Sequence, residues 1–167
     1  LALLFAGAAW HKLVDFTAFR IVLHDYRVLP LASVTPAAVS VVAIEIVLAL
    51  AFPWQAAAQP AALAAIVLLG VYSVAIAVNL GRGRRTLECG CAPSAYRQPL
   101  SEWLLLRNGL LIGACGLALL PVSARPWAWP DWLTLLGAVA VGASTWAAAQ
   151  RLLALATPPL ALRGAER

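Results

Sequence analysis

Two cysteines separated by one glycine carry the clearest chemical signal in the sequence. Cys89 and Cys91 stand in the segment GRGRRTLECGCAPSAYRQPLS, between two long apolar runs. Gly90 would ease the tight backbone of a CxC disulfide, and so small a ring is strained and easily reduced. The arginines that precede the pair favour thiolate over thiol. The pattern predicts thiol–disulfide exchange rather than a structural crosslink.

Two other interpretations of the cysteine pair remain open at this point. The pair could be incidental or structural, in a chain with 3 cysteines, or it could chelate a soft ion such as Cu(I), or Zn with further ligands. No second Cys/His pair follows nearby to complete a tetrahedral zinc site, which disfavours zinc, and our predicted site residues include no metal ligand. Cys115, inside an apolar run, is expected to be a packing residue, with a third thiol in a relay as the alternative.

A second group of candidate residues is polar at positions expected to lie inside a membrane. Glu45 stands near the middle of the second apolar run, Arg107 and Asn108 stand early in the fourth, and His11 and Lys12 end the first. Ionisable side chains at such depth cost several kcal/mol unless they are paired. Glu45 should lie roughly 15 Å and Arg107 roughly 9 Å below the same interface, at 1.5 Å per residue. We therefore expect a Glu45–Arg107 ion pair, with Lys12 as the second choice of partner.

The role of this polar group has two interpretations. It could lock helix packing, or it could form a proton-handling or quinone-headgroup site beside the thiols. Tyr72 and Asn79 would join it if their helix turns them inward, because residues seven apart share a helix face. We expect His11 and His24 to be interfacial hydrogen-bonding residues rather than metal ligands.

An unusually apolar chain must hold these few polar residues. Of its 167 residues, 63% are hydrophobic and 11% are charged, whereas a soluble domain has roughly 45–50% and about 25%. This composition excludes a soluble globule, a disordered chain, a collagen and a nucleic-acid-binding protein. We expect a small integral membrane protein in contact with the lipid bilayer. The sequence contains no Met, so we also expect the amino end to be processed or to lie upstream of Leu1.

Five charge-poor runs are candidate membrane spans, and prolines mark their ends. They cover about 1–14, 35–52, 60–80, 102–120 and 132–150. Over 16–27, apolar residues recur every three or four positions among charged ones, which predicts an amphipathic helix on the membrane interface. The apolar positions are Phe16, Phe19, Leu23 and Tyr26. We predict an all-α, polytopic transmembrane helical bundle of four to five spans plus this interfacial helix, in a single membrane domain over 1–167.

The basic residues predict an orientation in the membrane. Ten of them fall in loops on one side of the predicted bundle, and the other side has only Arg125. Because loops rich in Lys and Arg stay inside, we expect a multi-pass protein of the bacterial inner membrane with the Cys89/Cys91 loop on the cytoplasmic side. Four tryptophans lie on the Arg-poor side, as in an aromatic belt. They are Trp54, Trp127, Trp129 and Trp132.

Four motifs in order give the chain a family resemblance. The stretch AAWHKLVDFTAFRIVLHDYRVLP resembles the HK-x-x-D-x-x-x-F and YRLLP-like motifs that follow the first helix in the MauE branch of the MauE/DoxX membrane family. Glu45 matches that family's acidic residue in the second helix. ECGC with its proline- and serine-containing turn matches the cysteine loop, and LLLRNGLLI matches the RN at the start of the next helix. The match runs from about Phe5 to Gly113, and hydrophobicity alone matches the fifth run.

The resemblance implies a helical-bundle protein of thiol redox chemistry that serves thioredoxin-like partners, or another membrane subunit, in maturing exported proteins, as in methylamine dehydrogenase biogenesis. It makes Cys89 and Cys91 the redox pair. A thiolate of the pair would attack a partner disulfide, and its neighbour would resolve the mixed disulfide. The bundle would also exchange reducing equivalents with a quinone or with another thiol–disulfide couple. The implied polar framework is His11, Lys12, Asp15, Glu45, Arg107 and Asn108.

Other classes of function stay open. A non-catalytic membrane subunit could anchor or assemble a partner complex, with the CxC incidental, and a carrier could use Glu45 and the thiols for a small molecule or metal ion. Export maturation also calls for chemistry outside the cell, whereas the loop charges place the cysteines inside, where thiols are kept reduced. The pair would then draw electrons from the cytoplasm, or its loop would fold back into the bundle.

Overall fold

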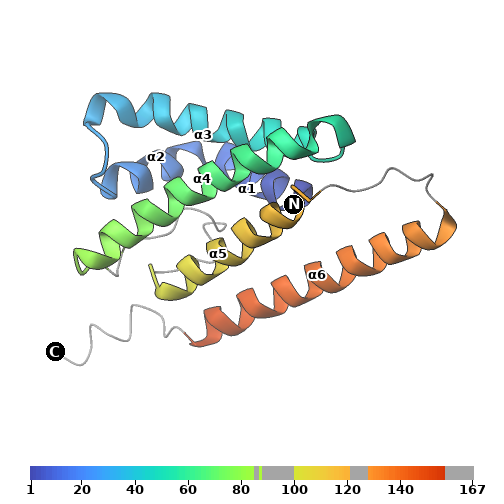
Figure 1. The fold of residues 1–167 in the computed structure, drawn as a ribbon. Helices are drawn as coiled ribbons and strands as arrows, with labels where there is room; N and C mark the ends of the chain where they lie inside the picture. The colour runs from blue at the N-terminus through green and yellow to red at the C-terminus, as the bar shows by residue number, and fades with distance from the viewer. Residues whose placement is uncertain (85–86, 88–99, 121–127, 157–167) are drawn as a thin grey trace. The chain divides into compact units, whose positions relative to one another are not determined.

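The computed structural model describes residues 1–84, 87, 100–120 and 128–156, and within them it contains helices and no strand. The helices are α1 (Ala2–Val14), α2 (Phe16–Asp25), α3 (Leu31–Ala51), α4 (Gln55–Gly81), α5 (Glu102–Leu117) and α6 (Trp129–Ala156) (Figure 1). The chain divides into two compact units, Leu1–Pro121 with the first five helices and Val122–Arg167 with α6. The predicted all-α fold class is confirmed. The single-domain organisation stays a prediction.

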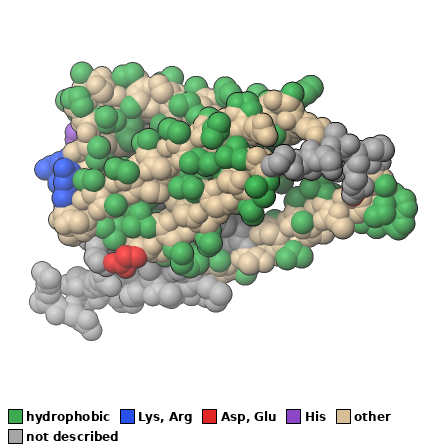
Figure 2. Space-filling view, viewed as in Figure 1, with side chains coloured by type: hydrophobic (Ala, Val, Ile, Leu, Met, Phe, Trp, Pro, Cys, Tyr) green, Lys and Arg blue, Asp and Glu red, His purple; other side chains and the backbone are tan. Residues whose placement is uncertain are grey.

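Three helices are long and apolar enough to cross a membrane: α3, α4 and the Trp129–Ala149 part of α6. The other two predicted spans, 1–14 and 102–120, correspond to shorter helices: α1 has 13 residues and α5 has 16. Large hydrophobic side chains are exposed on all of these helices, and they are spread over the visible surface (Figure 2). A surface of this kind suits contact with lipid, so the chain is a multi-pass membrane protein.

Asp15 divides the amino-terminal stretch into two helices. Its backbone leaves the helical region, with φ −129° and ψ 64°, and its side-chain Oδ1 accepts a hydrogen bond from the backbone N–H of Ala18 at 3.0 Å. Asp is among the residues that best cap a helix start, because the carboxylate satisfies an otherwise unpaired N–H. The chain therefore ends α1 just after Lys12 and begins α2 at once.

The predicted amphipathic pattern of α2 agrees with the burial of its side chains. Phe16, Phe19 and Leu23 are half-buried and Tyr26 is buried, whereas the charged positions between them are exposed. Both α1 and α2 pack against α3, so together they run beside it (Figure 1). At the end of α2, Tyr26 is buried against Ile76 of α4 and Leu104 of α5. The position of α2 at the membrane interface stays a prediction.

α3 and α4 form an antiparallel pair with a short connection. Each contains a proline as its sixth residue, Pro36 in α3 and Pro60 in α4. So near a helix start, a missing N–H removes little of the hydrogen-bond ladder. α3 begins at Leu31, four residues earlier than the sequence predicts. α4 ends at Gly81, and Gly83 follows with φ +73°, a conformation that glycine adopts without strain.

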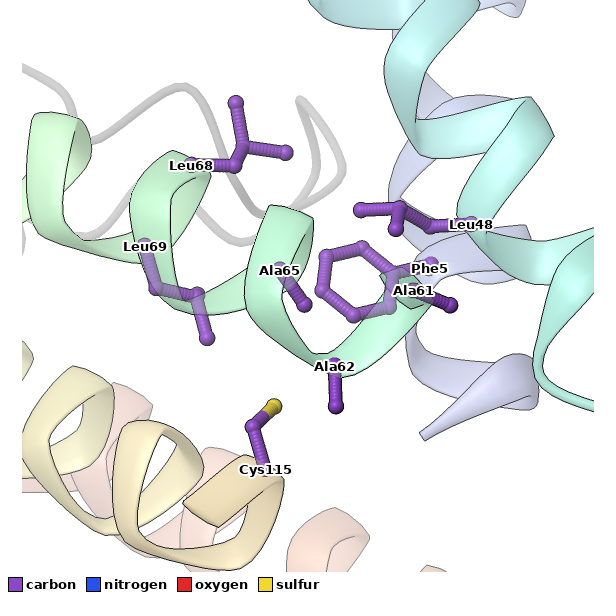
Figure 3. Packing of buried hydrophobic residues seen from close by; sticks show 8 residues of the cluster. All are labelled: Phe5, Leu48, Ala61, Ala62, Ala65, Leu68, Leu69 and Cys115. Atoms are coloured by element: carbon purple, nitrogen blue, oxygen red, sulfur yellow. The ribbon is translucent and has the colours of Figure 1, made fainter. Parts of the chain in front are cut away.

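A buried apolar cluster joins α1, α3, α4 and α5 near the α3–α4 connection. Small alanines of α4 allow the close approach of Phe5, Leu48 and Cys115 from the other three helices (Figure 3). The Phe5 ring also stacks on Phe52, with 5.9 Å between ring centroids. We call this group the apolar cluster. Its members are Phe5, Leu48, Ala61, Ala62, Ala65, Leu68, Leu69 and Cys115.

A second buried group lies at the opposite end of the first unit, and we call it the end cluster. It consists of Tyr26, Ile76, Leu100 and Leu104, with Leu87 packed against it. The backbone N–H of Leu100 donates to the carbonyl of Leu87 at 3.0 Å. The ends of α2 and α4 and the start of α5 therefore meet at one end of the unit, together with Leu87 and Leu100.

α6 begins with a compact cap of its own. The backbone N–H of Ala128 donates to the Oδ2 of Asp131 at 2.8 Å, and the hydroxyl of Thr134 donates to the Asp131 carbonyl at 2.9 Å. Trp129 and Trp132 are exposed in this first turn. Exposed tryptophans at a span end are typical of a membrane–water interface.

Candidate functional site

Lys12 and Glu45 form an ion pair inside the bundle. The Lys12 Nζ donates to the Glu45 Oε1 at 2.5 Å, and the two side chains are only 3% and 1% exposed. Lys12 comes from the last turn of α1 and Glu45 from the second half of α3. An unpaired charge in an apolar interior is strongly destabilising, so each of these two ions can be buried because the other compensates its charge.

Tyr72 of α4 completes this site. Its hydroxyl donates to the same Glu45 Oε1 at 2.8 Å, so one carboxylate oxygen accepts from both a cation and a phenol. The Lys12 Nζ also lies 5.3 Å from the centroid of the Phe19 ring and 5.5 Å from that of Tyr72, within the range of cation–π attraction. We call these four residues, Lys12, Glu45, Tyr72 and Phe19, the charged cluster.

The structure selects Lys12, the second choice of partner, because of how α1 packs. Phe5 lies in one cluster with Leu48, and Lys12 pairs with Glu45, so α1 runs antiparallel to α3. Glu45 is 14 residues from the start of α3, about 21 Å at 1.5 Å per residue. Arg107 is only about 7.5 Å into α5 by the same measure, and its Nη2 lies 3.4 Å from the Oδ1 of neighbouring Asn108. In the described part of the chain, the buried ion pair of Glu45 is therefore with Lys12 and not with the expected Arg107.

A second polar group links α4 to α5, and we call it the amide cluster. The Asn108 Nδ2 donates to the Ser73 hydroxyl at 3.3 Å, and that hydroxyl donates to the Leu69 carbonyl at 2.8 Å. Arg107, Asn108 and Ser73 form this cluster. Tyr72 and Ser73 are consecutive, so one turn of α4 contacts Glu45 on one side and Asn108 on the other.

Asn79 lies two turns further along α4 and is fully buried. Its Nδ2 donates to the Ala75 carbonyl at 3.0 Å, while its Oδ1 has no hydrogen-bond partner in the described part of the chain. Tyr72 and Asn79 are therefore both turned inward, which was the condition for their joining the polar group. Only Tyr72 reaches Glu45.

The remaining predicted residues lie apart from the charged cluster. His11 is exposed, and Asp15 is exposed and serves as the cap of α2. Cys115 is buried among apolar side chains of the apolar cluster. Cys89 and Cys91 lie outside the described residues. Within residues 1–84, 87, 100–120 and 128–156, no three His, Cys, Asp or Glu side chains come together as metal ligands would.

Two members of these sites, Ser73 and Phe19, were not expected there from the sequence. Ser73 directly follows Tyr72 in an otherwise apolar stretch, and a pair of adjacent polar residues points to two sides of one helix. Phe19 was predicted only as part of the apolar face of α2. Its place beside the ammonium of Lys12 depends on the bend at Asp15, which no hydrophobic pattern encodes.

Comparisons with known proteins identify the family of the chain. The family model described as methylamine utilisation protein MauE matches residues 1–121. The chain belongs to the MauE family. The matched range contains α1 to α5 and with them both polar clusters, and it ends before α6.

Several curated relatives in this family are similar over most of the chain. The methylamine utilization protein MauE of Paracoccus denitrificans is 38% identical over 134 residues, covering 80% of this chain and 70% of the relative. The proteins of the same name from Paracoccus versutus and Methylorubrum extorquens are 40% and 39% identical, covering 75% and 74% of this chain and 68% and 67% of the relatives. No solved structure matches significantly. The resemblance drawn from the four motifs is confirmed.

Proposed function

We propose that this MauE-family protein is a membrane thiol–disulfide redox protein that exchanges electrons with a thioredoxin-like partner and supports the maturation of exported proteins for methylamine utilisation. The names of its relatives support a role in methylamine utilisation. The CxC pair at Cys89 and Cys91 supports thiol–disulfide exchange. Membership of the family and the multi-pass architecture support an accessory role in the membrane.

The observation that carries the proposal is the hydrogen bond from Leu100 N–H to the Leu87 carbonyl at 3.0 Å. Leu87 stands two residues before Cys89 and packs on the end cluster. The chain that bears the cysteine pair thus leaves and re-enters the unit at one place, where α2, α4 and α5 end or begin. The two described residues that flank the cysteine-bearing segment, Leu87 and Leu100, are therefore fixed side by side at the end of these helices.

The proposed exchange balances in two steps. A thiolate of the pair attacks one sulfur of the partner disulfide, which forms a mixed disulfide and releases the other partner sulfur as a thiolate. The second cysteine of the pair then attacks the mixed disulfide, which gives the CxC disulfide and a reduced partner. Two electrons pass to the partner, and a second dithiol returns the pair to its reduced form. In the reverse direction a quinone or another disulfide takes the two electrons.

In this proposal the charged cluster and the amide cluster are positioning groups. Tyr72 connects α4 to the α1–α3 pair and Ser73 connects it to α5, so the two clusters align the helices whose ends carry the loop. In lipid, where apolar packing gives little directional preference, hydrogen bonds between helices set their register. The alternative of a proton-handling role predicts a pH-dependent rate that Glu45→Gln abolishes.

Serine substitutions test the proposal. Cys89→Ser and Cys91→Ser should each abolish partner maturation in a methylamine-using host that lacks its own MauE, while the matched variant Cys115→Ser should retain it. A single-serine variant should also trap a mixed disulfide with the partner that dithiothreitol releases. Full maturation by the Cys89→Ser/Cys91→Ser double variant would refute the redox function and favour a non-catalytic subunit that anchors or assembles a partner complex.

The proposed location is the inner membrane, with the Cys89/Cys91 loop facing the cytoplasm. A membrane-impermeant maleimide should leave the two cysteines unlabelled in intact spheroplasts and label them after lysis. Labelling of intact spheroplasts would overturn the orientation, and would place the exchange on the side where exported proteins mature.

A further inference from the structure

The first unit carries a concentration of arginines where α2 and α4 end. Arg20 and Arg27 are exposed on and after α2, and Arg82 and Arg84 follow α4. Figure 2 shows Lys and Arg side chains gathered at one end of the helices, beside a histidine. In the described part of the chain, the acidic side chains near this end are Asp25, whose Oδ1 lies 3.4 Å from the His24 ring, and Glu102, the first residue of α5. The four arginines outnumber these two carboxylates, so the region carries a net positive charge, and we call it the arginine end.

Backbone carbonyls hold two of these guanidiniums in place. The Arg82 Nη1 donates to the Arg27 carbonyl at 3.4 Å, and the Arg84 Nη1 donates to the Asp25 carbonyl at 3.1 Å. Each contact engages one nitrogen of a group with five N–H donors. Such side chains are ordered before a ligand arrives and retain donors suited to bidentate phosphate binding.

An apolar stripe on α4 leads directly to Arg82. Val67, Val71, Val74 and Val78 are between 36% and 66% exposed, and their spacing of three and four residues places them on one face of the helix. Arg82 continues the same spacing one turn beyond Val78. The face therefore offers about 17 Å of hydrocarbon-compatible surface at 1.5 Å per residue, followed at once by a positive charge.

We propose that the arginine end, together with this valine stripe, is a binding site for an anionic phospholipid. The phosphate would lie between Arg82 and Arg84, and one acyl chain would lie along the valines. The valine stripe lies next to the arginines and suits an acyl chain. Inorganic phosphate has no acyl chain, so the two surfaces together favour a lipid over free phosphate. Clustered arginines where membrane helices emerge from the bilayer are the recognised way to bind acidic headgroups.

The test uses the full chain purified in a neutral detergent, with bound lipid counted by native mass spectrometry and stability followed by thermal unfolding. Phosphatidylglycerol should bind and raise the melting temperature, whereas phosphatidylcholine of the same chain length should do neither. Arg82→Gln/Arg84→Gln should bind phosphatidylglycerol about thirtyfold more weakly, if each arginine contributes the binding free energy typical of a basic residue near acidic headgroups. The charge-matched control Arg151→Gln/Arg163→Gln should bind it as the unmodified chain does.

Two further measurements separate lipid binding from a purely structural role of the arginines. Arg82→Lys/Arg84→Lys keeps both charges but loses the bidentate geometry, so it should bind phosphatidylglycerol with intermediate affinity. If the arginines only cap α2, the Gln variant will lose stability equally in both lipids, and the proposal fails. It also fails if glycerol phosphate without acyl chains binds as tightly as the whole lipid, or if the two Gln variants bind lipid equally.

Discussion

The charged cluster and the apolar cluster both join α1, α3 and α4, but they do so in different ways. On α1, Phe5 of the apolar cluster stands seven residues before Lys12, and on α3, Leu48 stands three residues after Glu45. The apolar cluster relies on close packing around small alanines, whereas the charged cluster relies on one carboxylate oxygen with two donors. Two neighbouring positions along the same helices are therefore held together differently, one by close apolar packing and the other by an ion pair and a hydrogen bond.

The difference matters because of the bilayer. Lipid tails are as apolar as Leu48, so burying it between helices gains packing but little transfer free energy. Leaving Glu45 or Lys12 unpaired among those tails would cost several kcal/mol. Packing therefore tolerates substitution, and the ion pair specifies which helices meet and at which height. Four substitutions test this comparison.

The largest effect should follow removal of one ion. Lys12→Met breaks the buried ion pair by removing the ammonium that donates to Glu45, which should lower the free energy of unfolding by about 3–5 kcal/mol. Denaturation in mixed micelles, followed by circular dichroism, measures this loss. Adding Glu45→Leu to Lys12→Met should restore most of it, because a buried pair can often be replaced by apolar residues of similar size. Failure of the double variant to recover would show that the pair has no such apolar substitute.

Truncation in the apolar cluster should have a smaller effect. Leu48→Ala opens a void among Phe5 and the α4 alanines, and we expect a loss of about 2 kcal/mol, near the low end for buried leucines because lipid lessens the transfer term. The same unfolding experiment measures it, with Leu50→Ala on the exposed side of α3 as the matched control. A loss greater than that of Lys12→Met would reverse the order of the two clusters.

Tyr72→Phe should sharpen the comparison further, because it removes a hydroxyl and keeps the ring. The hydrogen bond to Glu45 is lost while the ring remains beside the Lys12 ammonium. Hydrogen bonds between membrane helices contribute about 0.6 kcal/mol on average and at most about 1.7, so we expect a loss in that range. A cost as large as that of Lys12→Met would mean that the phenol, rather than the ammonium, is the main partner of the carboxylate.

The smallest effect is expected at Cys115. Cys115→Ser nearly conserves volume within the apolar cluster, and the new hydroxyl can donate to a carbonyl one turn back in α5, so the free energy of unfolding should fall by about 1 kcal/mol or less. Partner maturation, scored in the complementation strain, should stay normal. Loss of maturation with normal folding would make Cys115 a working third thiol.

The residue types of the site could be predicted from the sequence, but its pairing could not. Glu45, Lys12 and Tyr72 are conspicuous because they interrupt long apolar runs. Which cation meets Glu45 depends on helix starts and on which helices are neighbours. α3 begins four residues before the predicted start, which places Glu45 deeper than expected, and α1 rather than α5 supplies its partner at that level.

The helices themselves were predicted more closely. Prolines and charged loops bound the apolar runs, and backbone groups in a bilayer must be satisfied within each segment, so composition nearly specifies the helices. The interruption at Asp15 was less visible, although Asp before an apolar repeat is a cap signal. Cys89 and Cys91, the strongest chemical signal, lie outside the described residues, and their role still depends on sequence and family.

By itself, the sequence determined an all-α membrane protein of the MauE family, with two closely spaced cysteines between apolar runs and a few polar residues within those runs. These properties are local, because hydrophobic length and motif spacing follow from consecutive residues. Only the tertiary structure decided that Lys12, Glu45 and Tyr72 share one oxygen, that Ser73 and Asn108 join α4 to α5, and that Arg82 and Arg84 reach the end of α2. Each contact joins residues from different helices, and the relative heights of those helices depend on their packing.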